Sequence, residues 1–546
     1  MKRIIKPLFA IALFMLSNTI FSQDIETGLK YLDLNLNHKA AYYFSDLASK
    51  NPTNGKAFYY AGQAYFILGK NDSANYFYTK GVEADKNLAY NYIGVGKMLL
   101  QKGNVGDAFT NFEQAMKISK KDPIVYTLIG EAYYLGKEKN YTKALEYLNK
   151  AKDLDYKNID MLLTMGDMYM DQNNGGEALR YYGRATDFKN NCLKAWVKVG
   201  VVNTKANLYR DALAAFNNAK NIDSNYIPLY RELGELQYLA GKYDEACKAY
   251  AKYLAMGEYD VKDVTRYAYA LYLNKDYKTA LNYINKVLAT QPDDPTMLRL
   301  SSYCMYETND YKNGLVKIDK FFKIIDQTKI ISSDYEYYAK LLNKDGQDSL
   351  AVINYLKAIS MDNSKCELYE TIAKIYDNKK RYIDAGDNYD KLVKCSKNPS
   401  AQDYYMVGKS YFFGAVKIDS TKRNMYYYKA DSAFMKVAEL SPTSHIGNIF
   451  RARVCSRIDP DSKLGLAKPH YEAVIKLLES NPDKYKKELI EAYTYLGIYY
   501  YLQDDKDKSK ENMEKVKALD PNDPNANNIL KLLSNPAQKK GVKKTK

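Results

Sequence analysis

Residues that interrupt helices are scarce in this chain of 546 residues. It contains only 14 prolines and 28 glycines, whereas 46% of its residues are hydrophobic. Collagen-like, disordered and low-complexity chains are typically rich in proline and glycine, so the composition excludes those classes and permits a mainly helical protein. A chain of 62.6 kDa also exceeds what one compact core usually supports. We therefore expect either several domains or an array of repeats.

The short motifs of common catalytic and nucleotide-binding sites are missing as well. The three histidines share no motif, and HExxH, GxSxG and a phosphate-binding loop are all absent. The segment GVGK from Gly94 lacks the serine or threonine that follows the lysine of such a loop. The segment that starts at Asp171 has glycine at the fifth position where a calcium ligand would be needed. The sequence therefore predicts no catalytic residues, no metal site and no cofactor, and hence a protein that is not an enzyme.

Dense stripes of positive charge are also lacking, although the net charge is +16. Eight of these charges belong to the two ends, where no acidic residue offsets them: three within residues 1–6 and five within residues 539–546. The remaining excess is small for a body of this length. Nucleic-acid-binding proteins usually concentrate lysine and arginine on one face, so we expect no nucleic-acid partner.

The one pronounced hydrophobic run lies at the start of the chain. A basic beginning, an apolar segment from Leu8 to Leu16 and a polar tail together predict a secretory signal peptide over residues 1–22. The alternative, a retained membrane anchor, needs a longer run to span a bilayer. A lipid anchor needs a cysteine at the cleavage point, but the first cysteine is Cys192. We therefore expect a periplasmic protein that does not span the membrane after signal cleavage and is not a lipoprotein.

Small residues recur at a fixed interval along the chain. Gly28, Gly62, Gly96 and Gly130 are 34 residues apart, and the series continues through Gly166 and beyond. In most units another small residue follows after 12 positions, and a large apolar residue comes four positions later. Each unit therefore predicts two helices joined by a turn, in which a small side chain lets the two helices approach closely.

This pattern resembles the tetratricopeptide repeat (TPR) family, whose signature is W-x2-L-G-x2-Y, then A-x3-F, then P. The sixth unit carries Trp196, Gly200, Ala212 and Phe216 at matching positions, and it departs at Asn203, where tyrosine is usual. The resemblance runs from about residue 24 to 534. It implies an all-α fold, an α-solenoid of about fourteen helix-turn-helix units that form a right-handed superhelix. Trp196 is then a packing residue rather than a ligand-binding aromatic.

Later units depart from the regular length. About ten extra residues follow Gly414, and the unit around Ser456 is also stretched. We therefore divide the chain into a TPR array at 23–400 and a C-terminal TPR module at 401–534 with extended helices and a capping helix. Residues 535–546 would form a basic tail.

The resemblance also implies which residues face the concave wall, namely those one, five, eight and nine positions after Trp196 or its equivalents. In repeats seven to nine this rule selects Arg231, Tyr269, Tyr272, Arg299, Tyr303 and Tyr306. Further along it selects a basic strip of Lys340, Lys344, Lys374, Lys409, Arg453 and Arg457. These groups either bind an extended peptide, a sugar chain or an acidic segment, or they only fill and solvate the inner wall. The lysine and asparagine clamp of chaperone-binding TPR domains is not reproduced.

Two of the six cysteines are suited to pairing. The repeat register places Cys366 at the start of the first helix of the eleventh unit and Cys395 at the end of the second. Antiparallel helices bring these two ends together, which makes a disulfide our hypothesis; the other cysteines are interpreted as small buried fillers.

These observations favour a non-enzymatic scaffold or adaptor that mediates protein-protein interactions in the bacterial periplasm or in outer-membrane or secretion assembly. Its partners would be proteins or peptides of the cell envelope. The alternative is a glycan- or peptide-binding component of an envelope uptake system.

Overall fold

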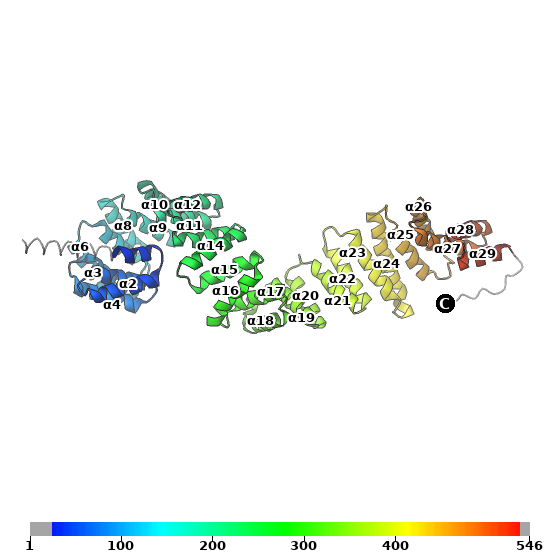
Figure 1. Ribbon diagram of the computed structural model, residues 1–546, viewed down its shortest axis with the longest axis horizontal. Helices are drawn as coiled ribbons and strands as arrows, with labels where there is room; N and C mark the ends of the chain where they lie inside the picture. The colour runs from blue at the N-terminus through cyan, green and yellow to red at the C-terminus, as the bar shows by residue number, and fades with distance from the viewer. Residues whose placement is uncertain (1–24, 535–546) are drawn as a thin grey trace, which may run out of the picture. The chain divides into compact units, whose positions relative to one another are not determined.

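The structure is a computed structural model that describes residues 25–534. The predicted signal peptide and basic tail lie outside the described residues. Within residues 25–534 the chain is made of helices and turns and contains no strand. It divides into two compact units at Thr308 and Asn309, called unit 1 and unit 2 below. Figure 1 shows successive helices paired within each unit.

The described part of unit 1 holds eight helix pairs followed by α17, and the first pair begins with a helix over residues 25–33. The other helices of this unit are α2 (Asn37–Lys50), α3 (Gly55–Ile67), α4 (Asn71–Ala84), α5 (Ala89–Gln101), α6 (Val105–Ile118), α7 (Pro123–Tyr134), α8 (Tyr141–Leu154), α9 (Ile159–Asp171), α10 (Gly175–Phe188), α11 (Leu193–Lys205), α12 (Tyr209–Ile222), α13 (Ile227–Leu239), α14 (Tyr243–Met256), α15 (Val261–Leu273), α16 (Tyr277–Thr290) and α17 (Pro295–Glu307).

Unit 2 continues the same alternation and ends on a single unpaired helix. Its helices are α18 (Tyr311–Ile324), the 3-10 helix η1 (Gln327–Lys329), α19 (Ser332–Lys344), α20 (Asp348–Met361), α21 (Glu367–Asn378), α22 (Tyr382–Cys395), α23 (Ala401–Ala415), α24 (Ser420–Leu440), α25 (Ile446–Ile458), α26 (Lys468–Leu478), α27 (Lys486–Leu502), α28 (Lys506–Leu519) and α29 (Pro524–Ser534). Residues 25–534 therefore contain 29 α-helices in the order that the repeats require, which confirms the predicted all-α fold, an α-solenoid of TPR units.

The small marker residues do what the repeat pattern requires. A Cβ atom built on Gly200 would overlap the ring of Phe216, and one on Gly234 would lie 2.7 Å from Cδ1 of Tyr250. Both rings are fully buried. Glycine on the first helix of a pair thus provides the space that an aromatic ring on the second helix fills.

Trp196 belongs to this packing. Its indole is half-buried, donates from Nε1 to the carbonyl oxygen of Asn190 at 2.7 Å, and packs against the cluster that contains Phe216 and Leu229. The interpretation of Trp196 as a packing residue is therefore confirmed.

The turns within the pairs are short and also depend on particular residue types. Glycine or asparagine adopts a left-handed backbone just after the first helix, as at Gly69, Asn173 and Asn207, with φ of 70°, 58° and 60°. These two residue types tolerate positive φ, so they end a helix and reverse the chain in few residues.

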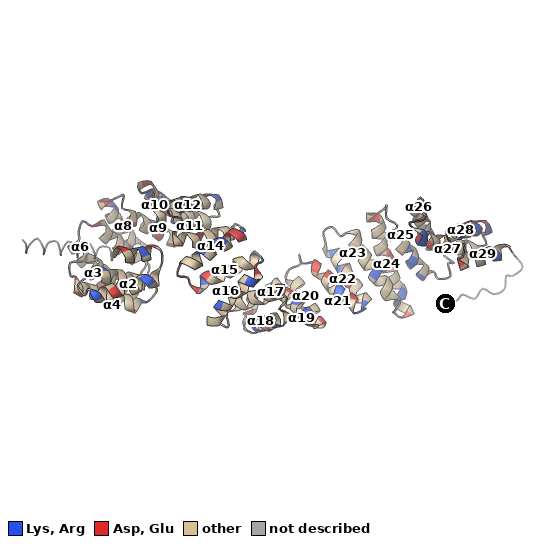
Figure 2. Ribbon diagram, in the orientation of Figure 1, with Lys and Arg blue, Asp and Glu red and all other residues tan. Residues whose placement is uncertain are grey.

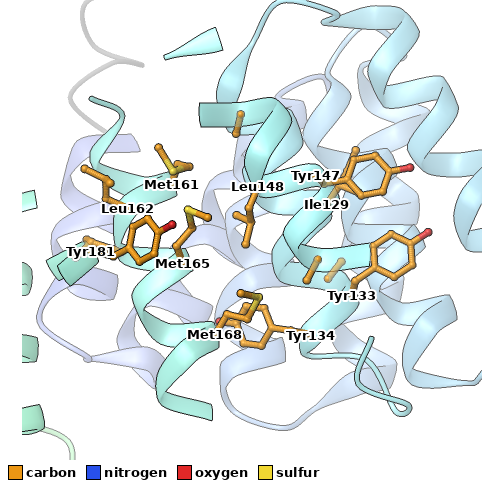
Figure 3. Packing of buried hydrophobic residues seen from close by; sticks show 14 of the residues in the cluster. Ile129, Tyr133, Tyr134, Tyr147, Leu148, Met161, Leu162, Met165, Met168 and Tyr181 are labelled. Carbon is orange, nitrogen blue, oxygen red and sulfur yellow. The ribbon is translucent and has the colours of Figure 1, made fainter. Parts of the chain in front are cut away.

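The largest buried cluster of unit 1 lies between neighbouring pairs. Figure 3 shows part of it around α7, α8 and α9, where Met161, Met165 and Met168 face the aromatic and aliphatic side chains of the preceding pair. Tyr133 and Tyr147 stack with ring centroids 5.6 Å apart. Each pair thus buries an apolar face that it could not bury alone.

Unit 1 also closes on itself. Leu36 is buried in a cluster with Ile227, Tyr230 and Tyr253 of α13 and α14. Because these partners lie about 190 to 220 positions along the chain, the first repeat is a neighbour of the seventh.

Two polar contacts reinforce this closure. The Glu258 carboxylate accepts hydrogen bonds from the backbone N–H groups of His38 and Lys39 at 2.7 and 2.9 Å. Lys194 of α11 forms an ion pair with Asp33 at 2.8 Å. The repeat pattern did not predict this closure.

In unit 2, helix α24 is extended to 21 residues and α27 to 17, whereas 14 is common elsewhere. One buried cluster, which contains Tyr389, Val407 and Phe434, runs across residue 400. The structure places its own division at residue 308, and the predicted boundary at 400 stays a prediction.

Candidate functional site

The inner faces of seven repeats of unit 1 enclose a cavity of about 1210 Å³, called the inner cavity below. Its walls come from the helix over residues 25–33, from α3, α5, α7, α9, α11 and α13, and from Tyr182 of α10. Because the first repeat contacts the seventh, these walls face one another around a common centre. The tyrosines of the inner cavity are Tyr59, Tyr60, Tyr90, Tyr134, Tyr182 and Tyr226.

The repeat geometry explains which residues reach this cavity. Positions one and five after Trp196 are Val197 and Val201, and both line it. The equivalent positions of the fourth repeat are Thr127 and Glu131, which also line it. Positions one and five of the concave rule thus select cavity residues in these repeats, which lie before repeats seven to nine of the predicted site. A sequence signal existed: Gln63, Lys97 and Glu131 are polar and are spaced by 34.

Acidic groups outnumber lysines in the inner cavity. Six carboxylates line it (Glu26, Asp33, Glu131, Asp160, Asp167, Glu232), against four lysines (Lys30, Lys194, Lys198, Lys205). Lys198 forms an ion pair with Asp167 at 2.6 Å, and Tyr182 donates to the same carboxylate at 2.5 Å. Lys97 and Arg231, which do not line the cavity, pair with Glu131 and Glu232, so the charges around the cavity are close to balance. Glu26 and Asp160 are its exposed carboxylates.

A buried lysine connects two of the cavity residues. The side chain of Lys97 is 3% exposed, and its Nζ lies 3.1 Å from Oε1 of Glu131 and 3.2 Å from Oε1 of Gln63. Tyr78 donates to the same oxygen of Gln63 at 2.8 Å, and the ring of Phe66 lies below the ammonium, its centroid 4.8 Å away. A buried charge needs such partners, and Lys97 in turn fixes the orientation of Gln63 and Glu131.

The phenols of the inner cavity stay protonated at neutral pH. Burial raises the pKa of Tyr134 and Tyr182 far above its usual value, and nearby carboxylates raise it further. For Tyr60 burial is the main cause of the raised pKa, followed by Asp160. These groups therefore remain neutral hydrogen-bonding groups rather than general bases.

The residues selected in repeats seven to nine lie elsewhere. Arg231 pairs with Asp263 at 2.8 Å and with Glu232 at 2.9 Å, and only Glu232 of these lines the inner cavity. Tyr269 and Tyr272 of α15 and Arg299 and Tyr306 of α17 are half-buried, and Tyr303 is buried. The rings of Tyr272 and Tyr303 lie 6.0 Å apart. None of these five lines the inner cavity, so the structure does not bring them into that site.

The basic strip is interleaved with acidic groups. Arg453 holds Glu491 through two hydrogen bonds of 2.9 and 2.7 Å, Lys340 pairs with Glu336 at 2.5 Å, and Lys374 pairs with Glu370 at 2.6 Å. The ring of Tyr311 lies 5.3 Å from the ammonium of Lys344. Figure 2 shows basic and acidic residues interspersed over both units.

The remaining predicted positions lie in unit 2 as well. Lys409 lines a smaller cavity of about 280 Å³, together with residues such as Asp377 and Phe413, whereas Arg457 is exposed. Cys366 and Cys395 form a disulfide with their Cα atoms 5.8 Å apart, across the ends of α21 and α22.

Known proteins were found that match parts of this chain. The model of the family described as anaphase-promoting complex, cyclosome, subunit 3, matches residues 239–324. The C-terminal part of a TPR repeat-containing protein from Cytophaga hutchinsonii is 35% identical; the match covers 49% of this chain and 99% of that one, with a TM-score of 0.35. The chain belongs to the tetratricopeptide repeat family.

Other relatives are more distant. The Protein CTR9 homolog of Arabidopsis thaliana is 26% identical over 176 residues, which are 31% of this chain and 15% of that protein. The chain thus spans a small part of that relative. A Pseudomonas aeruginosa PilF structure is 19% identical, and the match covers 39% of this chain and 96% of that one, with a TM-score of 0.33.

TPR proteins are typically non-catalytic scaffolds, and the TPR fold supports a role in protein interactions. No helix within residues 25–534 combines the length and the hydrophobicity needed to cross a bilayer.

Proposed function

We propose that this TPR protein is a non-enzymatic scaffold that holds an extended segment of a partner protein in the inner cavity of unit 1. The observation that carries the proposal is the cavity itself, about 1210 Å³ and walled by first helices of successive repeats. Pockets for small molecules usually occupy about 300–1,000 Å³. The inner cavity therefore has room for several residues of a peptide.

The chemistry of the walls defines the segment. The exposed carboxylate of Asp160 lies near Tyr60 and Tyr90, so a lysine or arginine of the segment that reaches it gains more than an aspartate or glutamate does. The tyrosine rings and the aliphatic side chains, such as Leu128 and Val201, offer contact to apolar and aromatic groups. Guanidinium groups also stack on aromatic rings. We therefore expect an extended segment in which basic residues alternate with apolar or aromatic ones.

Two matched peptides test the proposal. Both carry the same apolar and aromatic residues, but one has arginines where the other has glutamates, and binding to the full chain is measured by fluorescence anisotropy. The basic peptide should bind, and Tyr60→Ala and Asp160→Asn should each weaken it about tenfold, as a loss of about 1.4 kcal/mol implies. Lys374→Ala in unit 2 is the control and should bind normally. Stronger binding of the acidic peptide, or equal loss in all three variants, would contradict the proposal.

We further propose that the protein is exported to the bacterial periplasm, where it serves envelope or secretion assembly. The pattern of residues 1–22 supports export, and the disulfide between Cys366 and Cys395 suits an oxidising compartment. Cell fractionation with mass spectrometry of the mature N-terminus and of both cysteines tests this location. Recovery from the cytoplasm with residues 1–22 retained would refute it.

The alternative function, a glycan- or peptide-binding component of envelope uptake, has a separate readout. Stacking of sugar rings on the cavity tyrosines would make the protein bind an oligosaccharide array. Binding to the array that is lost in Tyr60→Ala would favour this alternative.

A further inference from the structure

A cluster of three different metal-binding side chains lies in unit 2, although the sequence predicts no metal site. Asp431 comes from α24, Cys455 from α25 and His470 from α26. A carboxylate oxygen, the thiol sulfur and a ring nitrogen all lie within 4.8 Å of one another. Because each residue comes from a different helix, no short spacing motif marks the cluster in the sequence.

The carboxylate of this cluster is held in place by an arginine. Arg451 donates from Nε and Nη2 to the two oxygens of Asp431 at 2.9 and 3.1 Å. It precedes Cys455 by four residues, so both lie on the same face of α25. Each carboxylate oxygen has two acceptor sites. Arg451 therefore orients Asp431, as outer residues do at metal sites, and leaves an acceptor site on each oxygen.

The thiol of this cluster is buried and the imidazole is half-buried. Cys455 is 7% exposed, and burial followed by the nearby Asp431 raises its thiol pKa to about 11. A bound cation would reverse this effect, because a coordinating thiol is deprotonated outright. His470 is half-buried, and Arg451 lies near its ring.

We propose that Asp431, Cys455 and His470 bind a divalent transition metal of the zinc class. Magnesium and calcium take oxygen ligands, whereas a set of sulfur, nitrogen and oxygen suits zinc. Zinc bonds of about 2.0–2.3 Å in a tetrahedron bring ligand atoms to roughly 3.5 Å from one another. The side chains must therefore close in by about 1 Å. Three protein ligands leave the fourth position to water or to a group of a partner, and the ion would fasten α24, α25 and α26 together.

Cobalt(II) titration of the full chain tests the site, after treatment with a chelator and without oxygen. One equivalent of cobalt should give a thiolate-to-cobalt charge-transfer band, and zinc should displace it. The band should vanish in Cys455→Ser. His470→Gln and Asp431→Asn should each weaken cobalt binding at least about tenfold, because loss of a residue that only hydrogen-bonds a metal ligand already lowers metal affinity by that factor.

Matched variants separate the site from adventitious binding. Cys247→Ser removes another buried thiol, and His445→Gln removes another histidine of unit 2; both should keep the band and the affinity. If Cys455→Ser does not fold, His470→Gln decides, because this side chain is only half-buried. Absence of the band at stoichiometric cobalt, or a band that persists at full strength in His470→Gln, would overturn the proposal.

Discussion

The closure of unit 1 depends on a carboxylate that caps a helix from another repeat, and its removal has a calculable effect. Leu36, the N-cap residue of α2, gives that helix no side-chain hydrogen bond. Instead Glu258, about 220 residues away, accepts from the first backbone N–H groups. Replacing a capping side chain by alanine costs about 0.5–2 kcal/mol, and negative charge at a helix N-terminus contributes about 0.3–1 kcal/mol. We therefore expect Glu258→Ala to weaken the closure by about 1–2 kcal/mol and Glu258→Gln by less.

Native-state hydrogen exchange measures this change at the amides involved. Exchange at His38 and Lys39 should accelerate about 5–30-fold in Glu258→Ala, the factor that 1–2 kcal/mol implies. Leu36→Ala, which removes a buried apolar side chain, should accelerate exchange at these amides further, because such truncations destabilise by about 2–5 kcal/mol. Glu245→Ala alters an acidic residue at the start of α14 and serves as the control. Unchanged exchange at His38 and Lys39 in Glu258→Ala would refute the closure, and with it the facing walls of the inner cavity.

Three other predictions concern the stability of the repeats. Gly234→Ala places a Cβ 2.7 Å from the ring of Tyr250 and should destabilise unit 1 by about 1–3 kcal/mol in urea unfolding. Gly183→Ala in α10, where a Cβ has open space, should instead stabilise unit 1 by up to about 1 kcal/mol. Equal effects of the two substitutions would contradict the packing role of the marker glycines. Replacing Cys366 and Cys395 together by serine should lower the thermal midpoint of unit 2 by the equivalent of about 3–4 kcal/mol, because the bridge spans 29 residues, and an unchanged midpoint would refute this. Burial lowers the pKa of His470 in the folded state, so the unfolded state takes up a proton at a higher pH and unit 2 should lose stability as the pH falls below about 6.5. In thermal unfolding, His470→Gln should make the midpoint of unit 2 less dependent on pH. A midpoint that rises as the pH falls would contradict this prediction.

The fold was predictable because its rules are local. Gly200 and Phe216 lie 16 residues apart within one pair, and their sizes alone predict that the two helices approach closely. The role of Trp196 followed from the same register. Periodicity of this kind reports contacts within a pair and between adjacent pairs.

The site was less predictable because its geometry is long-range. The contact between His38 and Glu258 joins residues 220 positions apart, and no repeat pattern encodes it. Val197 and Val201 line the cavity at positions that the concave rule also names, but without the closure nothing distinguishes the early repeats from later ones. The grouping of Asp431, Cys455 and His470 likewise depends on how three helices pack.

Photocrosslinking from inside the inner cavity tests the central claim most directly. A benzophenone side chain replaces Tyr60 in one protein and Lys374 of unit 2 in another, and each is irradiated with the basic, apolar peptide and analysed by mass spectrometry. The account predicts a peptide adduct at position 60 that an excess of unlabelled peptide suppresses, and none at position 374. An adduct at position 374 without one at position 60 would contradict it.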